Sequence, residues 1–158
     1  MIAAVLGAPG SGKSTVAGPL RSLLPSYAVV DWDDFMTPAS ALAGRDIRQH
    51  PDTWPAYRHL VRAVLDHMAR LPVVLLGVCT PDELRGWPIA WWILLDCTDQ
   101  ERQRRLQRDA RLSDLPGAVR DAREYRSLGL PVVDTTTRTP SEVAAELARL
   151  VQHQAGLA

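Results

Sequence analysis

Residues 7–14 restrict the fold of this chain more than any other segment. They read Gly-Ala-Pro-Gly-Ser-Gly-Lys-Ser and match the pattern GxxxxGK[ST]. An apolar run from Ile2 to Leu6 precedes them, and apolar residues recur at helical spacing after Lys13. Gly10 and Gly12 allow backbone conformations that turn successive amide hydrogens into one concavity, and a helix beginning there adds the positive end of its dipole. The pattern therefore predicts a strand, a phosphate-binding loop and a helix in direct succession.

The residues of this loop suit a nucleoside triphosphate. Lys13 is the only lysine in a chain whose other 17 basic residues are arginine, and a compact ammonium on a flexible stem suits contact with terminal phosphates. The hydroxyl of Ser14 is expected to contact Mg²⁺. The expected nucleotide-binding residues of the loop are Gly10, Ser11, Gly12, Lys13, Ser14 and Thr15.

Bulk composition is that of one soluble globular domain, residues 1–158. The formal net charge is zero and 46% of the residues are hydrophobic, so overall charge does not favour a nucleic-acid partner. The first six residues carry no basic residue and no run approaches the roughly 18 to 20 apolar residues of a membrane span. We therefore expect a cytoplasmic protein, monomer or homodimer, with Cys79 and Cys97 as buried free thiols.

Five short apolar runs alternate with helical patterns, which is typical of a parallel sheet covered on both faces. Helices are expected at residues 13–24 and 53–71, from Thr98, and after Thr139, where Thr-Pro-Ser-Glu forms a capping sequence. Residues 32–53 show little periodicity, and we interpret them as an acceptor segment. Residues 102–126 are rich in arginine, and we interpret them as a lid segment. The five expected strands are 2–6, 27–31, 73–78, 90–96 and 131–134.

Two large groups of nucleotide-binding proteins do not fit this chain. Guanine-specific switch proteins need an asparagine in an NKxD motif, and the chain contains no asparagine. The third expected strand, 73–78, ends without the carboxylate that motor and transporter ATPases carry there. Small phosphotransferases remain as the group that the sequence favours.

Three carboxylates follow the second expected strand. Asp31, Asp33 and Asp34 come directly after the apolar pair at positions 29 and 30. Strand alternation would place Asp31 and Asp33 on one side and Asp34 on the other. Two carboxylates beside a metal–nucleotide suit two tasks: one holds Mg²⁺ through its waters, and the other accepts the proton of an attacking hydroxyl. A solvated turn with a capping aspartate is the alternative interpretation, and Asp34 fits it best.

The chain combines a phosphate loop, an Asp-x-Asp pattern after the second strand and an arginine-rich lid. In this combination it resembles the nucleoside monophosphate kinase-like family. Shikimate kinase, gluconate kinase and chloramphenicol phosphotransferase are similar in size. The resemblance implies a P-loop NTPase three-layer α/β/α sandwich with a five-stranded parallel sheet in the order 2-3-1-4-5. It implies that Asp31 serves the Mg²⁺ shell and Asp33 contacts the acceptor. Residues 77–82, Gly-Val-Cys-Thr-Pro-Asp, match neither the glycine-rich acceptor motif of shikimate kinases nor the GFPR-like motif of adenylate kinases, so the acceptor stays open.

Arginines on the fourth expected helix are candidates for contacts with the transferred phosphoryl group. On a helix from Thr98, Arg104, Arg108 and Arg111 would share one face with Arg105 beside them, and a planar guanidinium suits charge on phosphoryl oxygens. Arg108 is the expected catalytic arginine and Arg105 an expected nucleotide ligand. A solvated face paired with nearby acids is the alternative.

Residues after the last strand are candidates for contacts with the adenine. In shikimate kinase an arginine-x-proline segment at this point packs against the base, so the resemblance implies that Arg138, Thr139 and Pro140 frame it.

The tryptophans Trp32 and Trp54, at either end of the acceptor segment, could stack on a ring-shaped substrate.

The sequence thus favours an ATP- and Mg²⁺-dependent kinase that transfers the γ-phosphoryl group to a small-molecule acceptor. Lys13, Asp33 and Arg108 would be catalytic, and Ser14 and Asp31 would hold the metal. Two alternatives stay open: a nucleotide-binding regulatory module with little or no turnover, and a nucleoside monophosphate kinase.

Overall fold

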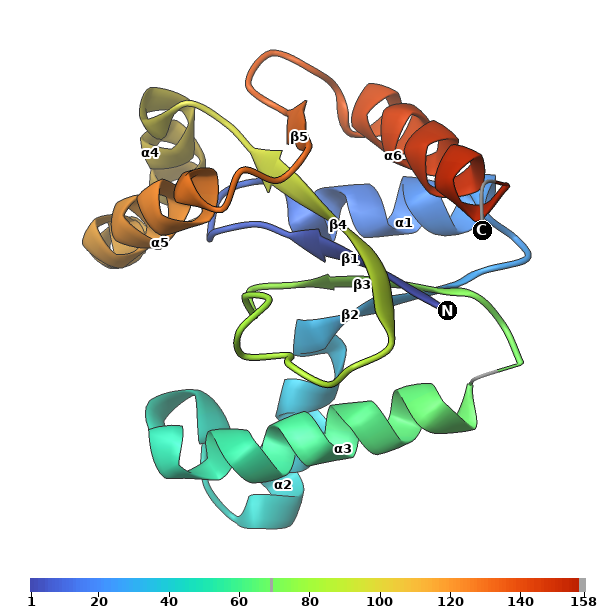
Figure 1. The fold of residues 1–158 in the computed structure, drawn as a ribbon. Helices are drawn as coiled ribbons and strands as arrows, with labels where there is room; N and C mark the ends of the chain where they lie inside the picture. The colour runs from blue at the N-terminus through green and yellow to red at the C-terminus, as the bar shows by residue number, and fades with distance from the viewer. Residues whose placement is uncertain (69, 157–158) are drawn as a thin grey trace.

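The computed structural model describes residues 1–68 and 70–156, and its centre is a five-stranded parallel sheet (Figure 1). The strands lie in the order β2-β3-β1-β4-β5, and every neighbouring pair is parallel. The predicted sheet and its order are therefore confirmed. The strands are β1 (Ile2–Leu6), β2 (Ala28–Asp31), β3 (Val73–Gly77), β4 (Ile89–Asp96) and β5 (Val132–Asp134).

Two helices cover one face of the sheet. The helices α1 (Lys13–Leu23) and α6 (Pro140–Ala155) pack side by side, and their buried residues join Val5, Leu76 and Leu95 in one apolar core. The N-terminus of α6 has the predicted capping box, in which the Thr139 hydroxyl and the Glu142 carboxylate bind each other's backbone amides. This layer anchors the helix that follows the phosphate loop.

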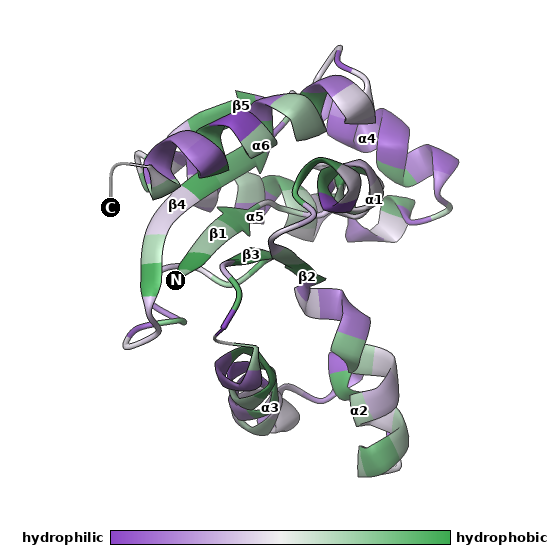
Figure 2. Ribbon diagram, turned by 90° about the vertical axis from the view of Figure 1, so that its right-hand side faces the viewer, coloured by the Kyte–Doolittle hydropathy of each residue, from purple (hydrophilic) through white to green (hydrophobic). Residues whose placement is uncertain are grey.

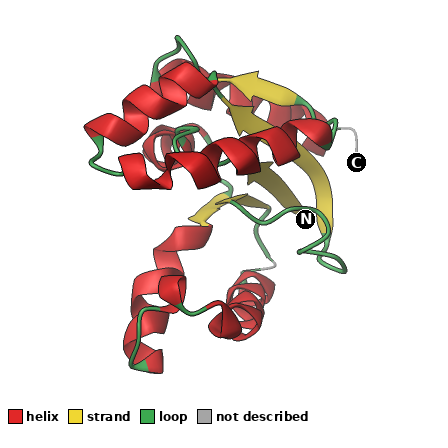
Figure 3. Ribbon diagram, turned by 90° about the vertical axis from the view of Figure 1, so that its left-hand side faces the viewer, coloured by secondary structure: helices red, strands yellow, loops and turns green. Residues whose placement is uncertain are grey.

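The opposite face is covered by α2 (Met36–Ala43) and α3 (Trp54–His67), with α5 (Leu115–Ser127) packed near β4 (Figures 1 and 3). Alternate strand residues such as Ile2, Val30 and Leu75 belong to this second core. Because most strand positions are buried between the two layers, the strands are largely apolar, and Figure 2 shows them mostly green while α4 (Asp99–Arg108) is mostly purple. The result is the predicted three-layer α/β/α sandwich.

The acceptor segment is more helical than predicted. It contains α2 together with short 3₁₀ helices at Trp32–Phe35, Ile47–Gln49 and Pro51–Thr53. The helix α2 is only eight residues long, so its periodicity is too brief to detect, although Gly44 in a left-handed conformation ends it. The helix predicted at residues 53–71 ends earlier, at His67, and position 69 lies outside the described residues.

The lid segment forms most of α4, a 3₁₀ turn at Leu112–Asp114 and most of α5. The prediction that Arg111 shares a helical face with Arg104 and Arg108 is wrong. The helix ends at Arg108, Ala110 has a φ of 54°, and the chain turns away before Arg111.

Across residues 1–68 and 70–156 we find no helix with the length and apolar character needed to cross a bilayer.

Candidate active site

A cleft of about 510 Å³ opens beyond the carboxyl ends of the strands, with the phosphate loop as its floor. Ligands of open α/β sheets bind at this edge because the loops that follow the strands meet there. The cleft brings together every sequence-predicted site residue except Ser11 and Asp31, which are buried beside it. The predicted residues that line it are Gly10, Gly12, Lys13, Ser14, Thr15, Asp33, Arg105, Arg108, Arg138, Thr139 and Pro140.

The loop has the curvature that phosphate binding requires. Gly10 and Gly12 have φ values of 78° and 99°, in the left-handed region that favours glycine. The amide of Ser11 donates to the carbonyl of Ala8 over 3.1 Å, which closes the turn. The helix α1 then starts directly at Lys13, so its positive dipole end faces the cleft.

Lys13 is folded back onto the loop. Its ammonium donates to the carbonyl of Gly7 and, over 3.3 Å, to that of Ala8. Only 9% of the residue is exposed, and burial lowers the pKa of Lys13 to about 8, partly offset by the nearby charges of Asp31 and Asp33. A desolvated ammonium at the head of a helix is a strong point charge for a phosphate.

The carboxylates after β2 differ from the predicted alternation. The strand ends at Asp31 and a 3₁₀ helix begins at Trp32, so residues 32–34 follow a helical and not a period-two geometry. Asp33 is exposed and lines the cleft. Asp34 accepts from Arg21 over 3.0 Å and from the amide of Asp31, which is the capping arrangement proposed as its alternative.

Ser14 and Asp31 carry oxygen ligands of the kind that a hard divalent cation takes. Asp31 is 5% exposed, and one of its oxygens accepts from the Asp33 amide over 3.0 Å. Burial raises the pKa of Asp31, so a nearby cation would stabilise its charged form. A hydroxyl and carboxylate oxygens are ligands that Mg²⁺ accepts in proteins, usually with several waters retained.

The arginines of α4 fall into two groups. Arg105 is largely buried: it donates to Glu101, to the carbonyl of Gly10 over 3.2 Å, and to both the hydroxyl and the carbonyl of Thr135. Arg104 and Arg108 are exposed and pair locally, with Glu101 and Asp109 respectively. The two arginines on Glu101 hold the pKa of this carboxyl down to about 2. Arg105 therefore contacts the loop itself, whereas Arg108 stands at the rim of the cleft.

The far end of the cleft is formed by residues 135–140. Arg138 donates to Glu146 and to the carbonyl of Glu142 over 3.2 Å, so its guanidinium lies against the first turns of α6. The side chain of Thr139 caps that helix. The capped helix start and the cleft wall are thus the same structure.

Two buried residues at the loop were missed by sequence reasoning. Arg102 is fully buried and donates to the carbonyl of Pro9 over 2.6 Å and to Asp96 over 2.5 Å. Thr135 is 3% exposed, and its hydroxyl donates to the carbonyl of Ser11 over 2.9 Å. Arg102 stands four positions before the buried Leu106, on the inner face of α4, and this spacing is the signal that could have identified it.

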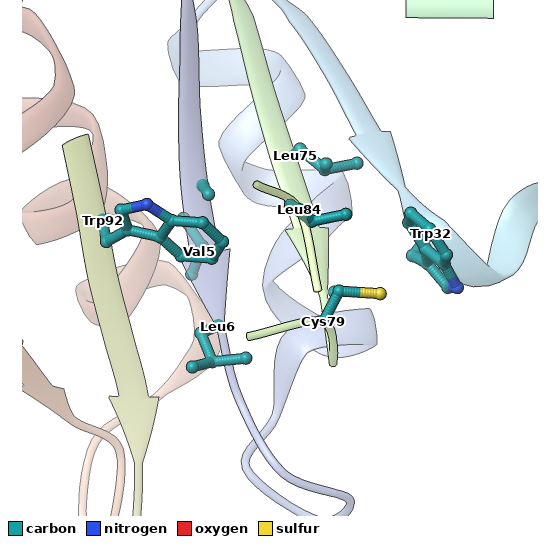
Figure 4. A pocket seen from close by; sticks show the side chains of 9 residues that line it. Val5, Leu6, Trp32, Leu75, Cys79, Leu84 and Trp92 are labelled. Carbon is teal, nitrogen blue, oxygen red and sulfur yellow. The ribbon is translucent and has the colours of Figure 1, made fainter. Parts of the chain in front are cut away.

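A second, apolar cavity lies on the acceptor side of the sheet (Figure 4). It has a volume of about 10 Å³, is lined by Leu6, Cys79, Leu84 and Trp92 among others, and holds at most about one water. Trp32 borders it but is 1% exposed and packs edge-on against Tyr57. The expectation that Trp32 stacks on a substrate is therefore wrong, because its ring belongs to the core.

The chain was compared with protein-family models, curated proteins and solved structures, and only solved structures gave matches. No family model matches the chain, and no curated protein matches it by sequence. Among solved structures, the tunicamycin resistance protein of Deinococcus radiodurans has a TM-score of 0.73 at 20% identity, over 95% of this chain and 94% of that one. Shikimate kinase from Acinetobacter baumannii in complex with shikimate has a TM-score of 0.64 at 18% identity, over 96% and 93%. TT1252 from Thermus thermophilus has a TM-score of 0.65 at 23% identity, over 96% and 97%.

These similarities extend over nearly the whole chain and establish its fold. It is the fold of the P-loop small-molecule kinases, with the parallel sheet order 2-3-1-4-5. The resemblance to shikimate kinase predicted from the sequence is confirmed at this level.

Proposed function

We propose that this protein is an ATP- and Mg²⁺-dependent phosphotransferase that moves the γ-phosphoryl group of ATP to a hydroxyl or phosphate of a small molecule. The observation that carries the proposal is that the phosphate loop, Asp33, Arg108 and residues 135–140 line one and the same cleft. A loop of this kind binds phosphate without a reaction, but a carboxylate on the same cleft supplies a base for an acceptor. The similarity in fold to shikimate kinases supports the same reaction type.

Each residue then has a defined task. The loop amides and the N-terminus of α1 hold the β- and γ-phosphates, while Lys13 leaves its carbonyl partners and neutralises developing charge. Ser14 and Asp31 would hold Mg²⁺, which would shield phosphate charge when bound. Arg108 exchanges its local partner Asp109 for a phosphoryl oxygen. Asp33 accepts the proton of the acceptor hydroxyl or orients it.

Residues 135–140 are proposed to hold the adenine, with Arg138, Thr139 and Pro140 along its edge and face. Arg105, expected from the sequence to contact the nucleotide, already donates to Gly10 and Thr135. Its contribution to nucleotide binding is therefore proposed to be through the loop that it supports.

The similar solved structures suggest which acceptors to try first. One is described as a shikimate kinase with shikimate and another as a tunicamycin resistance protein. Both names point to hydroxylated small molecules, so shikimate, tunicamycin, other hydroxylated antibiotics and sugar acids lead the panel, with nucleosides and nucleoside monophosphates beside them.

The test is acceptor-stimulated release of ADP from Mg·ATP, with Lys13→Ala as the blank. Stimulation by one acceptor class that is absent from the blank supports the proposal and names the class. Tight ATP binding without stimulation by any compound would favour a regulatory module, and ADP formation with AMP alone would favour a nucleoside monophosphate kinase.

A further inference from the structure

Three consecutive carbonyls of the phosphate loop are held from outside by side chains. The Pro9 carbonyl accepts from Arg102 over 2.6 Å, and the Gly10 carbonyl accepts from Arg105 over 3.2 Å. The Ser11 carbonyl accepts from Thr135 over 2.9 Å. Two of these donors stand on α4 and the third directly follows β5. The loop is therefore tied to two elements that are distant from it in the sequence.

Holding a carbonyl also orients the next amide. In a planar trans peptide the N–H points away from the C=O. The bonds to Pro9 and Ser11 therefore direct the N–H groups of Gly10 and Gly12 to the opposite side of the chain from Arg102 and Thr135. Amides fixed in this way form a concave anion site before any ligand arrives.

Arg102 is the most constrained of the three donors. It is completely buried, and its guanidinium spans from the Pro9 carbonyl to Asp96 at the end of β4. Its stem also packs on the loop, since a Cβ added to Gly10 would lie 3.0 Å from Cγ of Arg102. A buried arginine is costly unless it is well paired. Asp96 already has a second partner, Arg126 of α5, at 2.6 Å, so charge pairing of Asp96 does not by itself require Arg102.

We propose that Arg102 is a positioning residue that fixes the Pro9–Gly10 peptide in its phosphate-binding orientation, and that Thr135 does the same for the Ser11–Gly12 peptide. Arg105 holds the peptide between them, whose Ser11 amide closes the turn onto Ala8. The inference rests on the proposed function in taking phosphate as the ligand of the loop. Arg102 does not touch the ligand. It makes the anion site rigid, and the same bonds keep α4 docked on the loop.

The experiment compares Arg102→Met with Arg126→Met. Both variants remove one of the two arginines on Asp96, but only the first removes the donor to Pro9. Binding of inorganic tripolyphosphate and of ATP is measured by calorimetry, stability by urea unfolding, and exchange of the amides in residues 7–13 by mass spectrometry. We expect Arg102→Met to weaken both ligands at least tenfold and to speed exchange of the loop, and Arg126→Met to change either affinity less than twofold.

Equal affinities and equal loop exchange in wild type and Arg102→Met would overturn the proposal. If Arg102→Met does not fold, Thr135→Val gives the same test on the Ser11 carbonyl, with weaker tripolyphosphate binding and faster loop exchange expected and unchanged values refuting it. Failure of the proposed function is distinct: the wild-type protein would then bind ATP without acceptor-stimulated release of ADP, or would bind neither ligand. In both cases loop exchange in the variants would still decide whether these side chains hold the loop.

Discussion

Replacing Gly10 by alanine tests how tightly α4 holds the phosphate loop. Gly10 has a φ of 78°, and an added Cβ would meet Cγ of Arg102 at 3.0 Å and two further atoms at 3.4 Å. The left-handed conformation alone costs a non-glycine residue about 1 kcal/mol. The stem of Arg102 cannot withdraw because its guanidinium is held at both ends, so overpacking adds about 1 to 3 kcal/mol. We expect Gly10→Ala to lower the free energy of unfolding by about 2 to 4 kcal/mol.

Gly44 provides the matched control. Its φ is 67° and a Cβ there would meet nothing within 4 Å, so Gly44→Ala should lower the free energy of unfolding by only about 1 kcal/mol. Urea unfolding of both variants measures the difference, and calorimetry with ATP measures the effect on the loop. Gly10→Ala should bind ATP at least about tenfold more weakly, whereas Gly44→Ala should bind it normally. Equal losses of stability in the two variants, with ATP affinity kept in Gly10→Ala, would refute the packing argument.

Three further outcomes follow from the site and its surroundings. Asp33→Asn should lower kcat about 100-fold or more with little change in ATP affinity, since it removes a base and not a phosphate ligand; an unchanged kcat would refute its role. Binding of ATP should draw in a fraction of a proton near pH 8 and a smaller fraction at pH 7, because burial lowers the pKa of Lys13 to about 8 and phosphate favours the charged form. Affinity should therefore fall above pH 8, and buffers of different ionisation enthalpy would show the uptake, which Lys13→Arg should lack. Thr139→Ala should lower the free energy of unfolding by about 1 kcal/mol through loss of the α6 cap, and a loss clearly below about 0.5 kcal/mol, the low end for such caps, would contradict it.

The sheet was predictable because its signals are local. Each strand is a short apolar run, and the loop at residues 7–14 fixes where the first strand must end. Burial on both faces makes such runs largely apolar, so they are recognised without knowing their partners. The helix α2 was not predicted, since its eight residues show too short a pattern and much of its stability comes from packing.

The carboxylates show where a period-two argument fails. The residue types at positions 31, 33 and 34 indicated a polar site after β2, and Asp33 does line the cleft. Asp31 and Asp33 do lie near Lys13 while Asp34 pairs with Arg21, as the prediction grouped them. The period-two argument behind that grouping does not apply, however, because the strand stops at Asp31, whose side chain starts the 3₁₀ helix by accepting from the Asp33 amide. The side-chain direction of a capping residue, which ends a strand and begins a helix, cannot be predicted from the period of the strand or of the helix.

The arginines could not be ranked from their spacing because charge alone does not tell a ligand contact from a structural bond. In the fold, Arg102 and Arg105 turn inward and donate to loop carbonyls, while Arg104 and Arg108 stay outside in local pairs. Exposed pairs of this kind are worth about 1 kcal/mol or less, so Arg108 can exchange its partner for a phosphate at small cost. A buried arginine with several bonds cannot do so. Arginines in weak, exposed ion pairs are therefore the ones that can move to bind a ligand. Arginines with several buried hydrogen bonds are the ones that hold the shape of the site.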